Sequence, residues 1–159
     1  MYKDLLNLAL AGGGWLIALL TILLGYRERK SAREEERLGK TLDYFTGGSQ
    51  RRSIGISLLE GVWASNPRFR GVLVPLIANQ IVYLLLSSES HDAHNERNLT
   101  RLVMIFTAIP AIKELYGDRW GDVCDAISRK YGGETKGIAI PKSTLMFWAK
   151  NLGHKLHDS

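Results

Sequence analysis

The chain has 159 residues, of which 45% are hydrophobic and 23% are charged. This length suits one modest domain with a hydrophobic core and excludes a large multidomain enzyme. The net charge of +5 favours anionic partners. It falls short of the density of a dedicated DNA-binding tail, so we expect no DNA duplex as a partner. The single cysteine, Cys124, excludes an intrachain disulfide and a multi-cysteine zinc site.

An uncharged run of 22 residues extends from Leu5 to Tyr26. A bilayer core is spanned by roughly 20 apolar residues, so the run predicts a transmembrane helix. A secretory signal peptide is the alternative, but its basic region precedes the apolar run, whereas here the basic cluster follows it. Because juxtamembrane positive charge stays cytoplasmic, we expect a single-pass protein of the inner (cytoplasmic) membrane, with its N-terminus outside and its C-terminal domain in the cytoplasm.

Small residues are spaced four apart within this run, at Ala9 and Gly13 and at Gly14 and Ala18. Such spacing lets helices approach closely in lipid, and it predicts a homo-oligomer. The alternative is that consecutive glycines simply make the outer half of the span flexible.

Charged helix formers fill residues 27–46, with opposite charges three apart, as in Arg33 and Glu36. We expect a helical stalk there, ended by Gly47 and Gly48. The domain organisation is therefore an anchor at 1–26, a stalk or linker at 27–46 and a cytosolic helical domain at 47–159. The first domain helix is predicted at 50–64, with an apolar stripe of Ile54, Leu58, Leu59, Val62 and Trp63.

Further helices follow in the domain. Asn66-Pro67 ends the first helix and starts the next. Residues 71–88 lack charge but contain Pro75, so a buried central helix is favoured over a second membrane span. Residues 87–98 are expected to form a polar loop, and residues 102–112 are too short an apolar run to cross a membrane.

The C-terminal third is also expected to be mainly helical. A helix opened by Asp118 places Cys124 in the core as a small hydrophobe. Residues 132–143 form a loop or small hairpin before a last helix at about 144–156. The fold class is all-α, and residues 50–131 resemble HEAT-like or armadillo-like helical repeats.

The clearest binding candidate lies at residues 46–53, T-G-G-S-Q-R-R-S. Glycines allow close approach, a helix start presents free N–H groups and arginine supplies forked donors, all of which suit phosphate. No lysine stands where a Walker loop needs one. The alternative is a linker and helix cap. The candidate residues are Gly47, Gly48, Ser49, Gln50, Arg51 and Arg52.

Six further cations are candidates for the same ligand. They are Arg68, Arg70, Arg97, Arg101, Lys136 and Lys142. Together they could line a site at a subunit interface. Each is otherwise an ordinary solvated charge.

Nothing in the sequence argues for catalysis or for a cofactor. His91 with His94, and His154 with His157, are spaced three apart, but two ligands rarely make a metal site. The nucleophile motif G-x-S-x-G and the zinc motif H-E-x-x-H are absent from the sequence. We therefore expect neither a metal nor an enzyme.

The apolar span, the run Gly47-Gly48-Ser49-Gln50-Arg51-Arg52 and the Arg68/Arg70 pair resemble the architecture of small membrane effectors of prokaryotic antiviral signalling, including CRISPR-associated systems. This resemblance implies a cytosolic domain that binds a cyclic oligonucleotide and an oligomer that perturbs the bilayer. The alternative function is a non-enzymatic helical adaptor, tethered to the membrane, that recruits a protein through an apolar groove.

Overall fold

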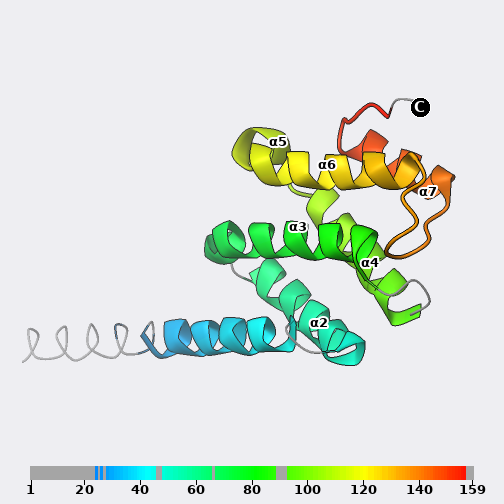
Figure 1. Ribbon diagram of the computed structural model, residues 1–159. Coiled ribbons are helices and arrows are strands. Elements are labelled where there is room, and N and C mark those ends of the chain that lie inside the picture. The colour runs from blue at the N-terminus through cyan, green and yellow to red at the C-terminus, as the bar shows by residue number, and fades with distance from the viewer. Residues whose placement is uncertain are drawn as a thin grey trace, which may run out of the picture. The chain divides into compact units, whose positions relative to one another are not determined.

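In the computed structural model, every regular element among the described residues is a helix (Figure 1). The structure describes Leu24, Tyr26 and residues 28–45, 48–65, 67–88 and 93–156. The predicted all-α class is confirmed for these residues. Apart from Leu24 and Tyr26, the apolar run and its small-residue pairs lie outside them. The chain divides after Gly39 into two units. Residues 28–39 of the first unit and 40–45 of the second are helical.

Helix α2 spans Ser49–Ser65, close to the predicted 50–64. It buries Ile56, Leu59 and Val62. Ile54 and Leu58, two members of the predicted stripe, are instead exposed. The reason is a close approach at Gly55, where a Cβ atom would lie 3.1 Å from Tyr44 Cβ, so α2 turns its Gly55 side toward residues 41–45.

The central element is α3, Arg70–Leu86, which follows the short 3-10 helix η1, Pro67–Phe69. It continues through Pro75, and seven of its residues are buried. Its largest contacts are with α6 and α4. Pro67–Leu86 is also the one described helix that is long and apolar enough to cross a bilayer, a test that the core helix of a soluble domain passes as well. Its burial in the domain agrees with the predicted central core helix.

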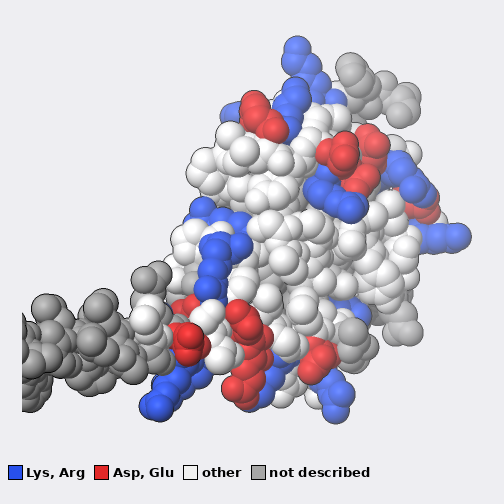
Figure 2. Space-filling model, turned by 90° about the vertical axis from the view of Figure 1, so that its left-hand side faces the viewer, with Lys and Arg blue, Asp and Glu red and all other residues white. Residues whose placement is uncertain are grey.

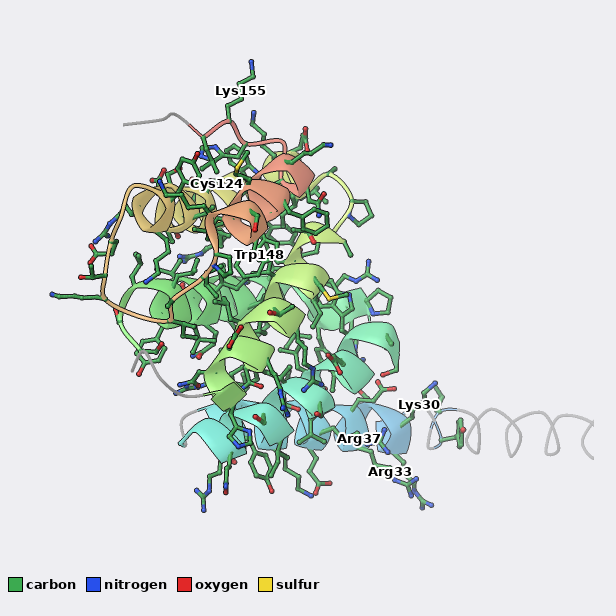
Figure 3. The ribbon with its side chains drawn as sticks, turned by 90° about the vertical axis from the view of Figure 1, so that its right-hand side faces the viewer. Lys30, Arg33, Arg37, Cys124, Trp148 and Lys155 are labelled. Carbon is green, nitrogen blue, oxygen red and sulfur yellow. The ribbon has the colours of Figure 1, made fainter. Side chains whose placement is uncertain are left out.

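Helix α4 spans Ala93–Thr107 and begins inside the predicted polar loop at 87–98. The loop prediction is wrong for residues 93–98, because Asn95 and Asn98 are buried against α2 rather than solvated. After a turn at Pro110, α5 spans Ile112–Leu115 and α6 spans Gly117–Tyr131. Cys124 on α6 is 1% exposed, which confirms its predicted core position (Figure 3).

Residues 132–141 form a loop without a strand. The loop packs on the carboxyl end of α3, where the Ile138 amide donates to the Leu84 carbonyl at 3.1 Å. Gly137 has a φ of 78°, and a Cβ there would lie 2.1 Å from the Leu85 carbonyl oxygen, so only glycine fits.

Helix α7 spans Lys142–Asn151, shorter at its end than the predicted 144–156. Its buried side carries Leu145, Trp148 and Ala149 (Figure 3). The chain after α7 is held on α6 by two hydrogen bonds. Trp120 Nε1 donates to the Leu152 carbonyl at 3.0 Å, and Ser128 Oγ lies 2.8 Å from His154 Nε2.

Candidate functional site

Polar side chains join α2 to α4 in register. Arg52 Nη1 donates to Asn95 Oδ1 at 3.0 Å, and Ser53 Oγ donates to Asn98 Oδ1 at 3.1 Å. Further along, Arg101 donates to both carboxylate oxygens of Glu60. We call these three contacts the α2–α4 seam. Residue numbers increase together along both helices, so α2 and α4 are parallel and begin at the same end of the domain (Figure 1).

Two adjacent helix starts favour an anion at this end. Each start presents free N–H groups and the positive end of a helix dipole. Arg51 on α2 and Arg97 on α4 are exposed, and neither has a hydrogen bond or ion pair within the part of the chain that the structure describes. Both lie one residue from a seam contact. The seam therefore brings predicted site residues from two distant segments to one end.

Arg52 is only partly available to a ligand. Besides its bond to Asn95, its guanidinium lies over the Tyr83 ring, with Cζ 5.2 Å from the ring centre. These contacts fix Arg52 among α2, α3 and α4. In a site, Arg52 would position neighbouring groups rather than donate to a ligand with both arms of its guanidinium group.

Four buried side-chain atoms of the described residues have no hydrogen-bond partner, and two of them lie in the seam, the others being Arg70 Nε and Gln80 Oε1. The two in the seam are Arg52 Nε and Asn98 Nδ2, and the Asn98 side chain is on a residue only 1% exposed. Rotating the Asn98 amide would only exchange which of its two atoms is unpaired. A buried unpaired group costs about 1–3 kcal/mol, so a ligand or water that reached these two atoms would remove that cost.

Gly48, Ser49 and Gln50 lead into Arg51 at the start of α2. Gly48 is exposed, and its carbonyl accepts the first α2 hydrogen bond, from the Arg52 amide at 2.9 Å. Gln50 is exposed as well. Ser49 begins the helix, while its side chain and Gly47 lie outside the described part of the structure.

Arg101 is already saturated by protein groups. Besides Glu60, it donates to Ser57 Oγ at 3.1 Å. The hydrogen bond to Glu60 raises the pKa of the Arg101 guanidinium above its usual value. It therefore serves the seam, although it shares a shallow hollow with Arg97 on α4.

Arg68 and Arg70 lie at the other end of α2. Their guanidinium carbons lie 4.6 Å from the Phe69 ring centre and 5.1 Å from the Trp63 ring centre. Since α2 has 17 residues, this end is about 25 Å from Arg51. The face in Figure 2 carries acidic and basic side chains interspersed with uncharged surface, not one concentrated basic patch. These two arginines do not share a site with Arg51.

Lys136 lies within the 132–141 loop, and Lys142 begins α7 directly after it. The Lys136 carbonyl accepts a hydrogen bond from Lys130 Nζ at 2.7 Å, and Lys142 Nζ lies 4.8 Å from the Tyr131 ring centre. Burial lowers the pKa of the Lys130 ammonium group. The loop meets the carboxyl end of α3, on the side of the domain where α2 and α4 begin (Figure 1). No contact joins either lysine to the seam among the described residues.

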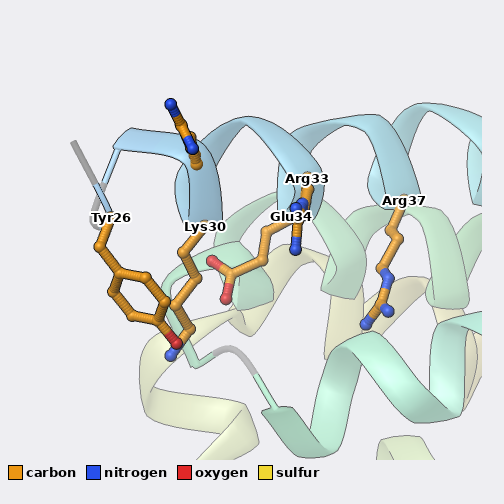
Figure 4. A pocket seen from close by; sticks show the side chains of 6 residues that line it. Tyr26, Lys30, Arg33, Glu34 and Arg37 are labelled. Carbon is orange, nitrogen blue, oxygen red and sulfur yellow. The ribbon is translucent and has the colours of Figure 1, made fainter.

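A second basic surface lies on the helical residues before Gly39. Tyr26, Arg29, Lys30, Arg33, Glu34 and Arg37 line one hollow (Figure 4). The spacing of Tyr26, Lys30, Arg33 and Arg37 puts them on one helix face. Four of the six side chains are cationic and one is anionic, so this face suits anionic lipid headgroups.

No three metal-binding side chains come together among the described residues. His91 and His157, one member of each predicted histidine pair, lie outside them. The Ser128–His154 contact joins groups 26 residues apart, so no local pattern indicates it. With the His154 ring edge-on to Trp120, the contact serves to hold the C-terminal segment on α6.

Sequence reasoning placed Asn98 beside Arg97 and Arg101 at a helix start, but it did not identify Tyr83 or Asn95. A signal existed for Asn95, since Asn95, Asn98 and Arg101 are three apart and would share one face of a helix begun at residue 93. The expectation of a loop up to residue 98 concealed it.

Comparison with the families of known proteins, with curated proteins and with solved structures finds no match to this chain.

Proposed function

We propose that this chain is a non-enzymatic, membrane-anchored effector that binds a phosphate-bearing anion, of the cyclic-oligonucleotide class, and perturbs the bilayer as a homo-oligomer. The observation that carries the proposal is the parallel pairing of α2 and α4. It places two helix starts and the exposed Arg51 and Arg97 at one end of the domain.

The proposed ligand contacts follow from this end. Arg51 and Arg97 donate to phosphate oxygens, and backbone amides near Gly48 and Gln50 supply further donors. Arg52 and Asn98 hold the two helices in register and offer the unpaired buried nitrogens. Arg68 and Arg70 are left out of the proposed site because they lie at the far end of α2, and Arg101 because Glu60 already engages it.

A ligand with several phosphates suits a symmetric assembly. In a cyclic oligomer the same arginine pair recurs around the axis and can contact successive phosphates of a cyclic ligand. The small residues at Gly13 and Gly14 supply a route to such an assembly. Their replacement by leucine should lower the oligomer mass measured by native mass spectrometry in detergent, and an unchanged mass would remove this route.

The proposed anchor is the run from Leu5 to Tyr26, with the N-terminus outside. The cationic face of residues 26–37 supports this orientation, because it suits the anionic cytoplasmic leaflet. Burial of α3 within the domain supports a single span. A cytoplasmic response from a reporter fused after Ser159 is expected, and an external response would contradict the topology.

The decisive experiment compares charge removal at the two ends of α2. The detergent-purified full chain is titrated with cyclic oligoadenylates of several ring sizes and with inorganic polyphosphate, by calorimetry. Each charged hydrogen bond contributes about 1.5–3 kcal/mol, so Arg51→Ala and Arg97→Ala should each weaken binding by about tenfold or more. Arg68→Ala removes the same charge at the far end and should leave binding unchanged.

Salt dependence provides a second readout of the same site. Phosphate affinity should fall steeply as the salt concentration rises, and the slope should become smaller in the Arg51/Arg97 double variant. Circular dichroism must show that each variant keeps its helices. If the double variant binds every tested anion as well as the unmodified chain does, the proposal fails at its principal site.

An open groove between α3 and α6 favours the adaptor as the second candidate. It measures about 410 Å³, and its lining combines Val82, Tyr83 and Leu86 with the charged Asp122, Asp125 and Arg129. A protein segment could dock there through apolar and charged contacts. Binding of such a partner should not respond to Arg51→Ala.

A further inference from the structure

The outward side of α7 combines two large apolar side chains with lysines. Met146 is 54% exposed and Phe147 is 60% exposed. At 100° per residue, Lys142, Ser143 and Lys150 fall on the same half of the helix as these two. The other half carries the buried Leu145, Trp148 and Ala149. The helix is therefore anchored in the domain by one side, and its other side presents an apolar centre beside Lys150. Lys142 lies at the edge of this side, with its Nζ 4.8 Å from the Tyr131 ring centre.

The charged side chains of α7 and of the chain up to Leu156 have a single sign. From Lys142 to Leu156 the chain contains three lysines and no aspartate or glutamate. The third, Lys155, extends outward after the end of α7 (Figure 3). Apolar tips with lysine stems beside them are the composition of helices that lie in the interface of an anionic bilayer. An acidic surface complements the charges of these lysines. The same surface must also admit the side chains of Met146 and Phe147.

The exposed side of α7 is the surface of one helix, and this geometry favours lipid as its partner. Protein interfaces depend on anchor residues that fill pockets. α7 lines neither the groove between α3 and α6 nor the hollow on α4, and it projects as one half of a single helix. A bilayer interface accepts such a convex face, because headgroups and acyl chains rearrange around the inserted side chains.

We propose that the Lys142–Lys150 face of α7 lies on anionic lipid, with Met146 and Phe147 entering the headgroup region. This surface is separate from the anion site at the starts of α2 and α4. It orients the domain at the membrane surface whether or not that site is occupied. The contact does not require a membrane anchor, because vesicles added to the solution can also supply the lipid. An anchor would only raise the local lipid concentration.

A fluorescent label at Ser143→Cys in the full chain tests the proposal. Ser143 is exposed at the centre of the face, whereas Cys124 is buried and its pKa is raised to about 12, so a thiol reagent selects the introduced cysteine. The chain is reconstituted in phosphatidylcholine vesicles with and without phosphatidylserine. The label should become shielded from aqueous iodide only when phosphatidylserine is present. A label at Thr100→Cys, exposed on α4, should stay accessible in both.

Variants of the face separate charge from apolar insertion. One lysine near an anionic surface contributes a factor of about five, so Lys150→Glu should lower the ratio of shielded to accessible label by about fivefold or more. Lys113→Glu, a matched reversal on α5, should leave the ratio unchanged. Phe147→Ser should abolish shielding even at low salt, because the cationic face alone cannot carry the label into the interface.

Two outcomes would overturn the proposal. Equal accessibility of the Ser143→Cys label in both kinds of vesicle would mean that no lipid covers the face. Equal shielding in both would mean that the contact does not depend on anionic lipid, whether neutral lipid, a second copy or another apolar partner covers the face. Titration of Lys150→Glu with the cyclic oligoadenylates and polyphosphate separates this proposal from the proposed anion site. Phosphate binding should persist in this variant although its lipid contact is lost.

Discussion

Arg52 on α2 donates a hydrogen bond of 3.0 Å to the side chain of Asn95 on α4, across 43 positions of the sequence. Asn95 is 5% exposed, so the contact is shielded from water on the α4 side. The Tyr83 ring of α3 lies against the same guanidinium. One arginine therefore links three helices, and its guanidinium group already contacts protein groups in the absence of a ligand.

Replacing Asn95 should destabilise the domain through this arginine. Asn95→Ala leaves Arg52 Nη1 partly buried without its acceptor, which should lower the free energy of unfolding by about 1–3 kcal/mol. Thermal unfolding of the detergent-purified chain, followed by circular dichroism, measures the change. Thr100→Ala, one to two turns along α4 and exposed, is the control and should change stability far less. Equal effects of the two variants would contradict the role assigned to Asn95.

Two glycines of the 132–141 loop should respond differently to alanine. Both Gly133 and Gly137 have positive φ, so either substitution strains the backbone. Only at Gly137 would the new Cβ also meet the Leu85 carbonyl oxygen, at 2.1 Å, whereas nothing lies within 4 Å at Gly133. Gly137→Ala should therefore lower the melting temperature clearly more than Gly133→Ala, and it should detach the loop from the end of α3. Similar melting temperatures would show that the loop does not pack there.

A matched glycine pair in α2 tests the contact with residues 41–45. Gly61→Ala meets open space and should stabilise the helix by about 0.5–1 kcal/mol through its higher helix propensity. Gly55→Leu inserts a side chain where Tyr44 Cβ and the Phe45 ring already lie at 3.1–3.4 Å. Overpacking of this kind costs about 1–3 kcal/mol. Urea unfolding of both variants should give shifts of opposite sign, and stabilisation by Gly55→Leu would refute the close approach.

Cys124 should be chemically inert in the folded chain. Burial, reinforced by the nearby Asp125 charge, raises the pKa of its thiol to about 12, so almost no thiolate exists at neutral pH. Because the raised pKa favours the protonated form in the folded state, this group should contribute stability below about pH 9 and lose it as the pH rises toward 12. Maleimide should modify Cys124 slowly in the native chain and quickly in urea. Rapid modification of the native chain would show that α6 opens or that the thiol is exposed.

The sequence by itself determined the local features of this protein. Apolar periodicity and breakers placed α2 and α6 within a few residues, because both signals depend on neighbours in the chain. The same periodicity put Cys124 on the buried face of α6. The apolar run from Leu5 to Tyr26 and the cations after it are likewise readable directly. These features need no knowledge of which helix packs against which.

Tertiary structure alone decided which cations are free. Arg51 and Arg52 are neighbours of the same type, yet Arg52 reaches Asn95 and Tyr83 while Arg51 stays exposed. Arg97 and Arg101 differ in the same way, because Glu60 on α2 lies beside only the second. The parallel register of α2 and α4 separates them, and that register arises from contacts more than 40 positions apart. Charge is a property of the residue, but its availability depends on which partner the packed helices bring to it.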